Sequence, residues 1–295
     1  MKNSALPDLS NDRRGYSSIS MLYPFFGRLP WYFPYFIHTC KYNPTIDFVI
    51  FTDNDPPAQL PVNVIFVYQT LSEFKKLASE KLKLDVQVEP QPYKFCDLRP
   101  AFGIIFEDYI SDYDFWGHGD TDVIFGDIRN FLTEEVLGNY DLICLRSDYM
   151  SSWFTIYRNS TKLNALFKNS KDYQKVFLTE KYYNFDETNF TFFEFAHRIP
   201  YQLVESEIES MTKVVKRLHE EGYIRAYFDM HAIEGKPGKT KWVNGKLIYK
   251  DKYEVMLYHL LELKHVYKPA ISSLRNPDTF HISPTRMYFP KSGQQ

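Results

Sequence analysis

Several features that would assign a chain to a specialised class are scarce in these 295 residues. Cysteine occurs three times, at Cys40, Cys96 and Cys144, without a CxxC pair. This argues against a disulfide framework or a zinc knuckle and favours a reducing compartment. An excess of one charge is missing as well, since 35 Lys and Arg face 37 Asp and Glu. Nucleic-acid-binding proteins usually carry a clear basic excess, so we expect no nucleic-acid partner.

Long apolar runs are also missing. Pro, Arg or Asp interrupts each apolar stretch well before the ~20 residues that a transmembrane helix needs. The N-terminus lacks the apolar core that follows a basic start in a signal peptide. We therefore expect a cytoplasmic protein, with peripheral contact at the inner face of the membrane left open.

What the chain does have is many aromatic residues, with 25 Phe and 23 Tyr. Aromatic rings fill protein cores, and they also form flat platforms for sugars and bases. Core packing is the expected role for most of them. Trp153, Phe154 and the tyrosines near position 182 are also candidates for stacking on an acceptor sugar.

Strands and helices alternate along the chain, which predicts an α/β fold with a parallel sheet covered on both faces. In such sheets ligands bind beyond the carboxyl ends of the strands. Asp53, in the loop after a predicted strand, is therefore a candidate donor contact, and a solvated turn is the alternative. An Asn244-Gly245 pair predicts a hairpin over 242–247. Strands are predicted at 17–26, 47–52, 62–67 and 140–145, and helices at 31–40, 71–84, 100–110, 204–218 and 254–265.

The most informative motif is Asp120-Thr121-Asp122, between the Gly-rich segment 117–119 and the apolar run 123–125. Two carboxylates near a core repel each other unless a cation balances them. In an extended chain both point to the same side, about 6–7 Å apart. Such hard oxygen ligands suit Mg²⁺ or Mn²⁺, which would also grip a diphosphate. The alternative is a turn whose Asp side chains cap a helix near Asp127.

Residues 93–132 resemble the DXD-containing sugar-binding region of GT-A glycosyltransferases, in particular enzymes of bacterial capsule and O-antigen polysaccharide synthesis. The stretch 122–128 is also similar to the segment that follows the motif in glycogenin-type transferases. The residues that carry the resemblance are Lys94, Asp97, Arg99, Trp116, Gly117, Asp120, Asp122 and Val123.

This resemblance implies a GT-A, Rossmann-like fold with a mostly parallel central sheet, flanking helices and a small C-terminal hairpin and helix. It implies one catalytic domain over 1–295, with a nucleotide-sugar-binding half (17–132), an acceptor-binding half (133–268) and a C-terminal tail (269–295). The implied activity is metal-dependent transfer of a sugar from a nucleoside-diphosphate sugar to a glycan or lipid-linked acceptor in bacterial surface polysaccharide synthesis. Uridine diphosphate is the expected nucleotide, and guanosine diphosphate is the rival.

The resemblance also assigns roles to the charged residues of the motif. Asp97 would contact the nucleoside, Asp120 the ribose or the metal, and Asp122 would be the principal metal ligand. Lys94 or Arg99 would meet a phosphate, for which ordinary surface charge is the alternative.

Two residues near the C-terminus are given roles by the same resemblance. His259 would complete the metal coordination, and Lys264 would reach the β-phosphate. The alternative for His259 is a half-buried histidine on an amphipathic helix.

Asp186 and Glu187 form a further acidic pair in an aromatic-rich stretch. A transferase that inverts the anomeric centre needs a carboxylate base for the acceptor hydroxyl, and either residue is a candidate, as are Asp148 and Asp229. A retaining enzyme needs no such base. Two other functions stay open: a nucleotidyl- or phosphotransferase on a similar sheet, and a carbohydrate-binding protein that has lost catalysis.

Overall fold

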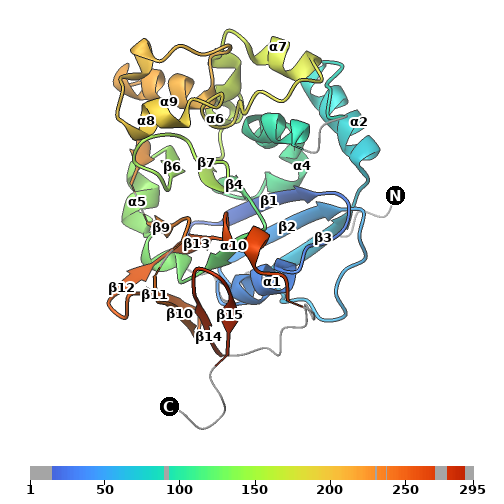
Figure 1. Ribbon diagram of the computed structural model, residues 1–295. Coiled ribbons are helices and arrows are strands. Elements are labelled where there is room, and N and C mark those ends of the chain that lie inside the picture. Colours follow the sequence, from blue (N-terminus) through green and yellow to red (C-terminus); the bar gives the residue numbers. More distant parts are fainter. Residues whose placement is uncertain (1–14, 90–92, 230, 237, 270–277, 290–295) are drawn as a thin grey trace.

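The computed structural model describes residues 15–89, 93–229, 231–236, 238–269 and 278–289. Within these ranges the largest sheet has seven strands in the order β3-β2-β1-β4-β7-β6-β8 (Figure 1). Of these strands β7 alone runs antiparallel to its neighbours, which confirms the predicted mostly parallel α/β sheet. The strands are β1 (Ile19–Phe25), β2 (Ile46–Thr52), β3 (Val64–Tyr68), β4 (Phe115–Gly119), β6 (Leu142–Cys144), β7 (Phe154–Arg158) and β8 (Ala226–Phe228).

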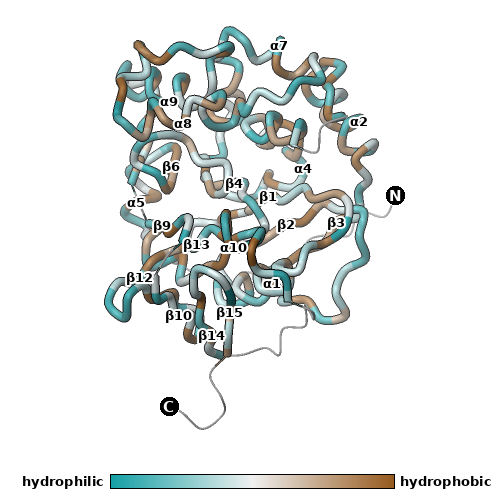
Figure 2. Tube along the Cα trace, viewed as in Figure 1, coloured by the Kyte–Doolittle hydropathy of each residue, from teal (hydrophilic) through white to brown (hydrophobic). Residues whose placement is uncertain are grey.

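Helices cover both faces of this sheet, because its strands are apolar on both sides. Every residue of β2 is buried, and the strand is largely brown in Figure 2. Phe48 and Ile50 pack with α1 (Phe33–Lys41) on one face. Val49 and Phe51 point the other way, toward a core that includes α2 (Leu71–Leu82) and α9 (Met211–Glu220).

Local signals account for several helix ends. Thr70 and Glu73 form a capping box at the start of α2. The predicted helix 204–218 begins only at Met211, after the N-cap Ser210, and Gly222 follows its end with φ +70°. The predicted helix 100–110 is divided between a 3₁₀ helix and two short helices. The remaining helices are α3 (Phe102–Ile105), α4 (Glu107–Ile110), α5 (Glu134–Asn139), α6 (Thr161–Asn164), α7 (Tyr173–Leu178), α8 (Phe192–Ala196) and α10 (Leu263–Val266), with 3₁₀ helices at Lys94–Ala101, Ile128–Asn130, Leu166–Asn169 and Tyr201–Leu203.

Two smaller sheets occupy the C-terminal part of the chain. A five-stranded sheet contains the predicted hairpin, with Asn244 and Gly245 at φ +45° and +85°. Part of the predicted tail joins it, because β14 pairs with β10. A three-stranded sheet has the order β5-β13-β9. The strands are β10 (Thr240–Val243), β11 (Lys246–Tyr249), β12 (Tyr253–Val255), β14 (Thr279–Ile282) and β15 (Met287–Tyr288), and β5 (Val123–Phe125), β13 (Leu257–His259) and β9 (Ala232–Ile233).

The predicted helix over 254–265 is wrong. That segment forms β12, β13 and then the short helix α10. All three residues of β13 are buried between β5 and β9. A short apolar run that is buried on all sides has the same pattern in a strand and in a helix, so periodicity alone could not separate them.

Two further observations concern the whole described chain. Cys40, Cys96 and Cys144 are buried and form no disulfide. In the ranges that the structure describes, every helix is too short or too polar to cross a bilayer.

Candidate metal centre

Asp120 and Asp122 lie in the short connection between β4 and β5. Strand β4 is central and fully buried, with β1 and β7 as neighbours. It ends at Gly119, where a Cβ atom would lie 2.7 Å from the carbonyl oxygen of Trp153. The close approach of this backbone explains why glycine precedes Asp120. The connection that carries Asp120 and Asp122 thus lies at the carboxyl edge of the sheet, as the sequence predicts.

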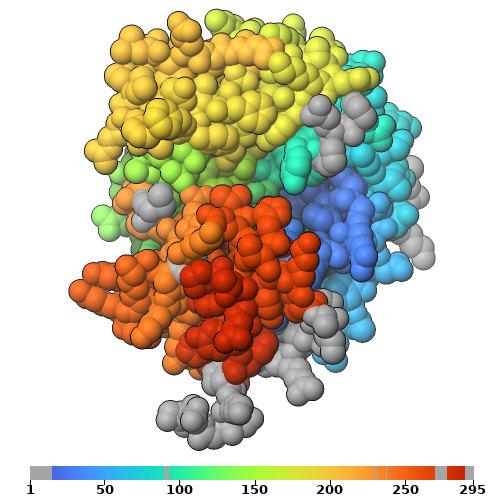
Figure 3. Space-filling view, in the orientation of Figure 1, coloured from blue at the N-terminus to red at the C-terminus, as the bar shows by residue number. Residues whose placement is uncertain are grey.

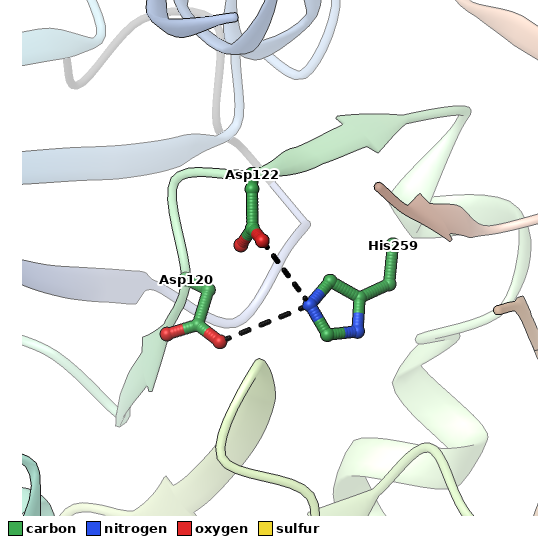
Figure 4. Close-up of side chains that lie close together, drawn as sticks. All are labelled: Asp120, Asp122 and His259. Carbon is green, nitrogen blue, oxygen red and sulfur yellow. Dashed lines mark ion pairs between the residues drawn. The ribbon is translucent and has the colours of Figure 1, made fainter. Parts of the chain in front are cut away.

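His259 reaches this connection through a strand pairing. Strand β13 runs antiparallel to β5, with His259 opposite Val123, and the Leu260 amide donates to the Asp122 carbonyl oxygen over 2.8 Å. The imidazole Nε2 lies 3.4 Å from Oδ2 of Asp122 and 4.0 Å from Oδ2 of Asp120 (Figure 4). One ligand atom from each of the three residues lies within 4.8 Å of the others.

Opposite charges lie close together inside this cluster. Burial favours the neutral form of Asp122, but His259 and Lys264 hold the pKa of this carboxyl below its ordinary value. Burial also disfavours the charged imidazole, yet hydrogen bonds to Asp122 and Glu234 raise the pKa of His259 to about 10. The Lys264 ammonium lies 2.7 Å from Oδ2 of Asp122. Without a metal ion, protonated side chains therefore neutralise the two aspartates.

The donor set fits a divalent cation. Two carboxylates and one imidazole are ligands that Mn²⁺ accepts, and Mg²⁺ accepts the carboxylates. Asp120 remains partly exposed, with 26% of its side chain accessible, so water or a substrate oxygen has access to the same place. The side chains of Asp122 and His259 are 5% and 6% exposed and are held by their strands.

Behind His259 lies a second layer that the sequence did not reveal. The imidazole Nδ1 lies 3.2 Å from Oε1 of Glu234, which itself pairs with Arg146. Arg146 also binds both carboxylate oxygens of Asp148, at 2.8 and 2.7 Å. Carboxylates in this position orient ligand histidines in metal sites.

Arg99 connects the cluster to the predicted acidic pair. Its guanidinium lies 2.5 Å from Oδ1 of Asp120 and 3.3 Å from Oδ2 of Asp186. Asp186 is buried, and its other carboxylate oxygen has no hydrogen-bond partner in the described structure. Burial raises the pKa of Asp186 well above its ordinary value, although Arg99 opposes this. Glu187 accepts from the Ser152 amide at 2.9 Å and from Asn184 at 2.8 Å.

Comparison with known protein families identifies the family of this chain. A model described as "Family of unknown function (DUF6625)" matches residues 21–290. The chain belongs to this family. No curated protein matches the sequence.

Solved structures similar to this DUF6625 member include two glycosyltransferases. The apo form of the glycosyltransferase GlyE from Streptococcus pneumoniae TIGR4 matches with a TM-score of 0.37 and 10% identity, over 73% of this chain and 46% of that one. This chain thus spans about half the length of GlyE. The galactosyltransferase LgtC, in complex with donor and acceptor sugar analogs, matches with a TM-score of 0.34 and 11% identity, over 73% of this chain and 75% of LgtC.

Lys94 and Asp97, two predicted donor contacts, lie in the core. Both side chains are 0% exposed, and Lys94 Nζ lies 3.0 Å from Oδ2 of Asp97. Asp97 also accepts from the backbone amides of Tyr183 and Phe185, at 3.0 and 2.8 Å. The structure therefore favours a structural role, in which this pair fixes the segment that leads into Asp186 and Glu187.

Asp53 follows β2 at the same edge of the sheet as Asp120, because β1, β2 and β4 are parallel. Its carboxylate accepts from the Gly27 amide at 2.9 Å and so joins the ends of β1 and β2. Asp53 is exposed at this edge. Its contact with a donor stays a prediction.

Proposed function

We propose that this chain is a glycosyltransferase that uses a divalent metal ion, Mn²⁺ or Mg²⁺, and a nucleoside-diphosphate sugar. The convergence of Asp120, Asp122 and His259, each offering a ligand atom within 4.8 Å of the others, carries this proposal. A metal ion held there would stabilise the negative charge that develops on the departing nucleoside diphosphate.

Two cations beside the ligands support a diphosphate rather than a bare metal as the occupant. Lys264 pairs with Asp122 and Arg99 pairs with Asp120. A ligand anion next to the two aspartates would therefore lie within reach of an ammonium and a guanidinium, which bind phosphate oxygens well. In this proposal residues 17–132, with Asp53 at the sheet edge, bind the nucleotide, most simply uridine diphosphate.

Asp186 and Glu187 have different roles in this proposal. Asp186 is buried against Arg99 and serves as a positioning residue that orients the guanidinium toward Asp120. Glu187 is 8% exposed, and its carboxylate oxygens are held by Ser152 and Asn184. It is the better candidate for the base that takes the proton of an acceptor hydroxyl, if the reaction inverts the anomeric centre. The acceptor, a glycan or lipid-linked saccharide of bacterial surface polysaccharide synthesis at the cytoplasmic face, would bind to the half formed by 133–268.

A thermal-shift screen of nucleotide sugars with and without Mn²⁺ tests this function. A ligand present at 100 times its dissociation constant adds about 2.7 kcal/mol of stability. Stabilisation by one nucleoside-diphosphate sugar that requires Mn²⁺, and release of the intact nucleoside diphosphate during turnover, are the expected results. Release of pyrophosphate would instead indicate a nucleotidyltransferase. Saccharide binding that a chelator leaves unchanged, without turnover of any donor, would indicate a binding protein.

A further inference from the structure

Three aromatic side chains, Tyr93, Tyr182 and Phe190, lie in a row on the protein surface. The rings of Tyr93 and Tyr182 have centroids 6.2 Å apart, and those of Tyr182 and Phe190 are 5.4 Å apart. Tyr93 and Phe190 are 62% and 55% exposed, while Tyr182 between them is half-buried. We call these three residues the aromatic strip. Large apolar side chains exposed side by side on a protein surface often mark a binding site.

The backbone holds the end of the strip in an unfavourable conformation. Phe190 has φ +64°, in the left-handed region that a bulky residue rarely adopts. Asn184 stabilises this loop, because its Oδ1 accepts from the amides of Thr188 and Phe190, each at 3.2 Å. The loop thus keeps an aromatic ring in solvent at a conformational cost, which is typical of functional segments.

The same asparagine links the strip to the acidic pair. Nδ2 of Asn184 contacts the Tyr182 hydroxyl at 3.2 Å and donates to Oε2 of Glu187 at 2.8 Å. Burial, and after it the negative charge of Asp186, raises the pKa of Tyr182. Tyr93 immediately precedes the 3₁₀ helix Lys94–Ala101, which carries Arg99. Asn184 therefore links the strip to the acidic pair of the candidate site.

We propose that the aromatic strip is the platform for the acceptor, and that this acceptor is a saccharide of more than one sugar ring. The assignment rests on the proposed function and adds the substrate surface to it. A pyranose presents a face of C–H groups that packs on aromatic rings, and its hydroxyl groups find partners in the tyrosine phenols. A row of three rings spans more than one sugar, and Asn184 links its middle ring, Tyr182, to Glu187. In Figure 3 the yellow upper layer, which includes residues 178–203, meets the orange and red C-terminal segment across the front of the molecule.

The charges around the strip favour a saccharide over an anionic membrane as its occupant. Binding to anionic lipid requires a surplus of lysine and arginine near the surface. Here the neighbouring lysines Lys175 and Lys181 both pair with Glu207. Among the residues that the structure describes, the strip therefore offers aromatic rings and hydroxyl groups beside lysines that already pair with a glutamate.

The test uses the double variant Tyr93→Ala/Phe190→Gly, in which glycine suits the positive φ of position 190. The matched control is Phe193→Ala, which removes a ring that is 68% exposed three residues further along. Saturation-transfer NMR with linear malto-, cello- and chito-oligosaccharides measures acceptor binding, and calorimetry with Mn²⁺ and uridine diphosphate measures donor-site binding. Circular dichroism checks that each variant is folded. A second variant, Tyr182→Leu, removes the middle ring without changing position 190.

We expect the double variant and Tyr182→Leu to bind oligosaccharide on the order of tenfold more weakly, with donor-site affinity and the Phe193→Ala control unchanged. The acceptor platform is overturned if these variants bind oligosaccharide like the wild type, or if the wild type binds none of the panel. It is also overturned if vesicles of phosphatidylglycerol, and no saccharide, occupy the strip. A wild type that binds oligosaccharide through the strip but binds Mn²⁺ with neither uridine diphosphate nor guanosine diphosphate would contradict the proposed function instead.

Discussion

Two clusters of opposite charges differ in their surroundings. The Lys94–Asp97 pair is closed, since both side chains are 0% exposed and Asp97 accepts three hydrogen bonds. The cluster around Asp122 is open, because Asp120 and Lys264 remain 26% and 22% exposed. A closed pair has no position left for a ligand and can act only on folding. An open cluster keeps carboxylate oxygens accessible, and a metal ion can replace the protons that neutralise them.

The largest effect is expected from breaking the closed pair. Lys94→Met leaves Asp97 buried without its cation, and removal of one partner from a buried ion pair costs about 3–5 kcal/mol. Chemical denaturation measures the loss in the free energy of unfolding. At low temperature, where the variant is still folded, Mn²⁺ should bind with the affinity of the wild type. A loss below about 1 kcal/mol would show that the pair is not the structural element described here.

In the open cluster we expect Asp122→Asn to reduce activity more than it reduces the free energy of unfolding. Loss of the most buried metal ligand should lower the turnover of a nucleoside-diphosphate sugar at least about 100-fold, through lost stabilisation of the leaving group. Initial rates of nucleoside diphosphate release measure it. Asp112→Asn, an exposed aspartate outside the cluster, is the matched control and should keep full activity. Equal rates for Asp122→Asn and Asp112→Asn would show that Asp122 takes no part in the reaction.

A weaker effect is expected from the residues behind the ligands. Glu234→Gln keeps the shape of the side chain but removes the charge that faces Nδ1 of His259. Loss of such a partner typically lowers metal affinity by about 10–100-fold. Calorimetric titration with Mn²⁺ measures it, with the exposed Glu262→Gln as the control. Unchanged affinity would show that Glu234 does not orient the imidazole.

The smallest expected effect is the release of a proton when Mn²⁺ binds. Because His259 has a pKa of about 10 in the protein without metal, Mn²⁺ must displace its proton in order to bind the imidazole. We expect about one proton released per ion at pH 7–8, and an affinity that rises with pH through this window. Mn²⁺ titrations in two buffers with different ionisation enthalpies measure the release. Binding without proton release would mean that the imidazole is not a ligand.

The sequence predicted four of the seven strands of the central sheet, at 17–26, 47–52, 62–67 and 140–145, because their apolar runs are local patterns. It also singled out Asp120, Asp122 and His259, which the structure brings together. For His259 the expected helix was wrong, since the β5–β13 pairing joins segments far apart in the chain.

Other parts of the site could not be read from local patterns. The contact of Glu234 with His259 depends on tertiary packing, and no local spacing reveals it. Lys94 and Asp97 carry the charges of a ligand site, but their mutual pairing and burial become visible only in the folded chain.

The most direct test of the metal centre is pulsed electron paramagnetic resonance of Mn²⁺ bound to the protein together with uridine diphosphate. The spectrum should contain the coupling of one imidazole nitrogen, lost in His259→Gln, and the coupling of phosphorus from the diphosphate. Bound Mn²⁺ that shows neither the nitrogen of His259 nor phosphorus would contradict the proposal that these residues hold a metal ion against a nucleoside diphosphate.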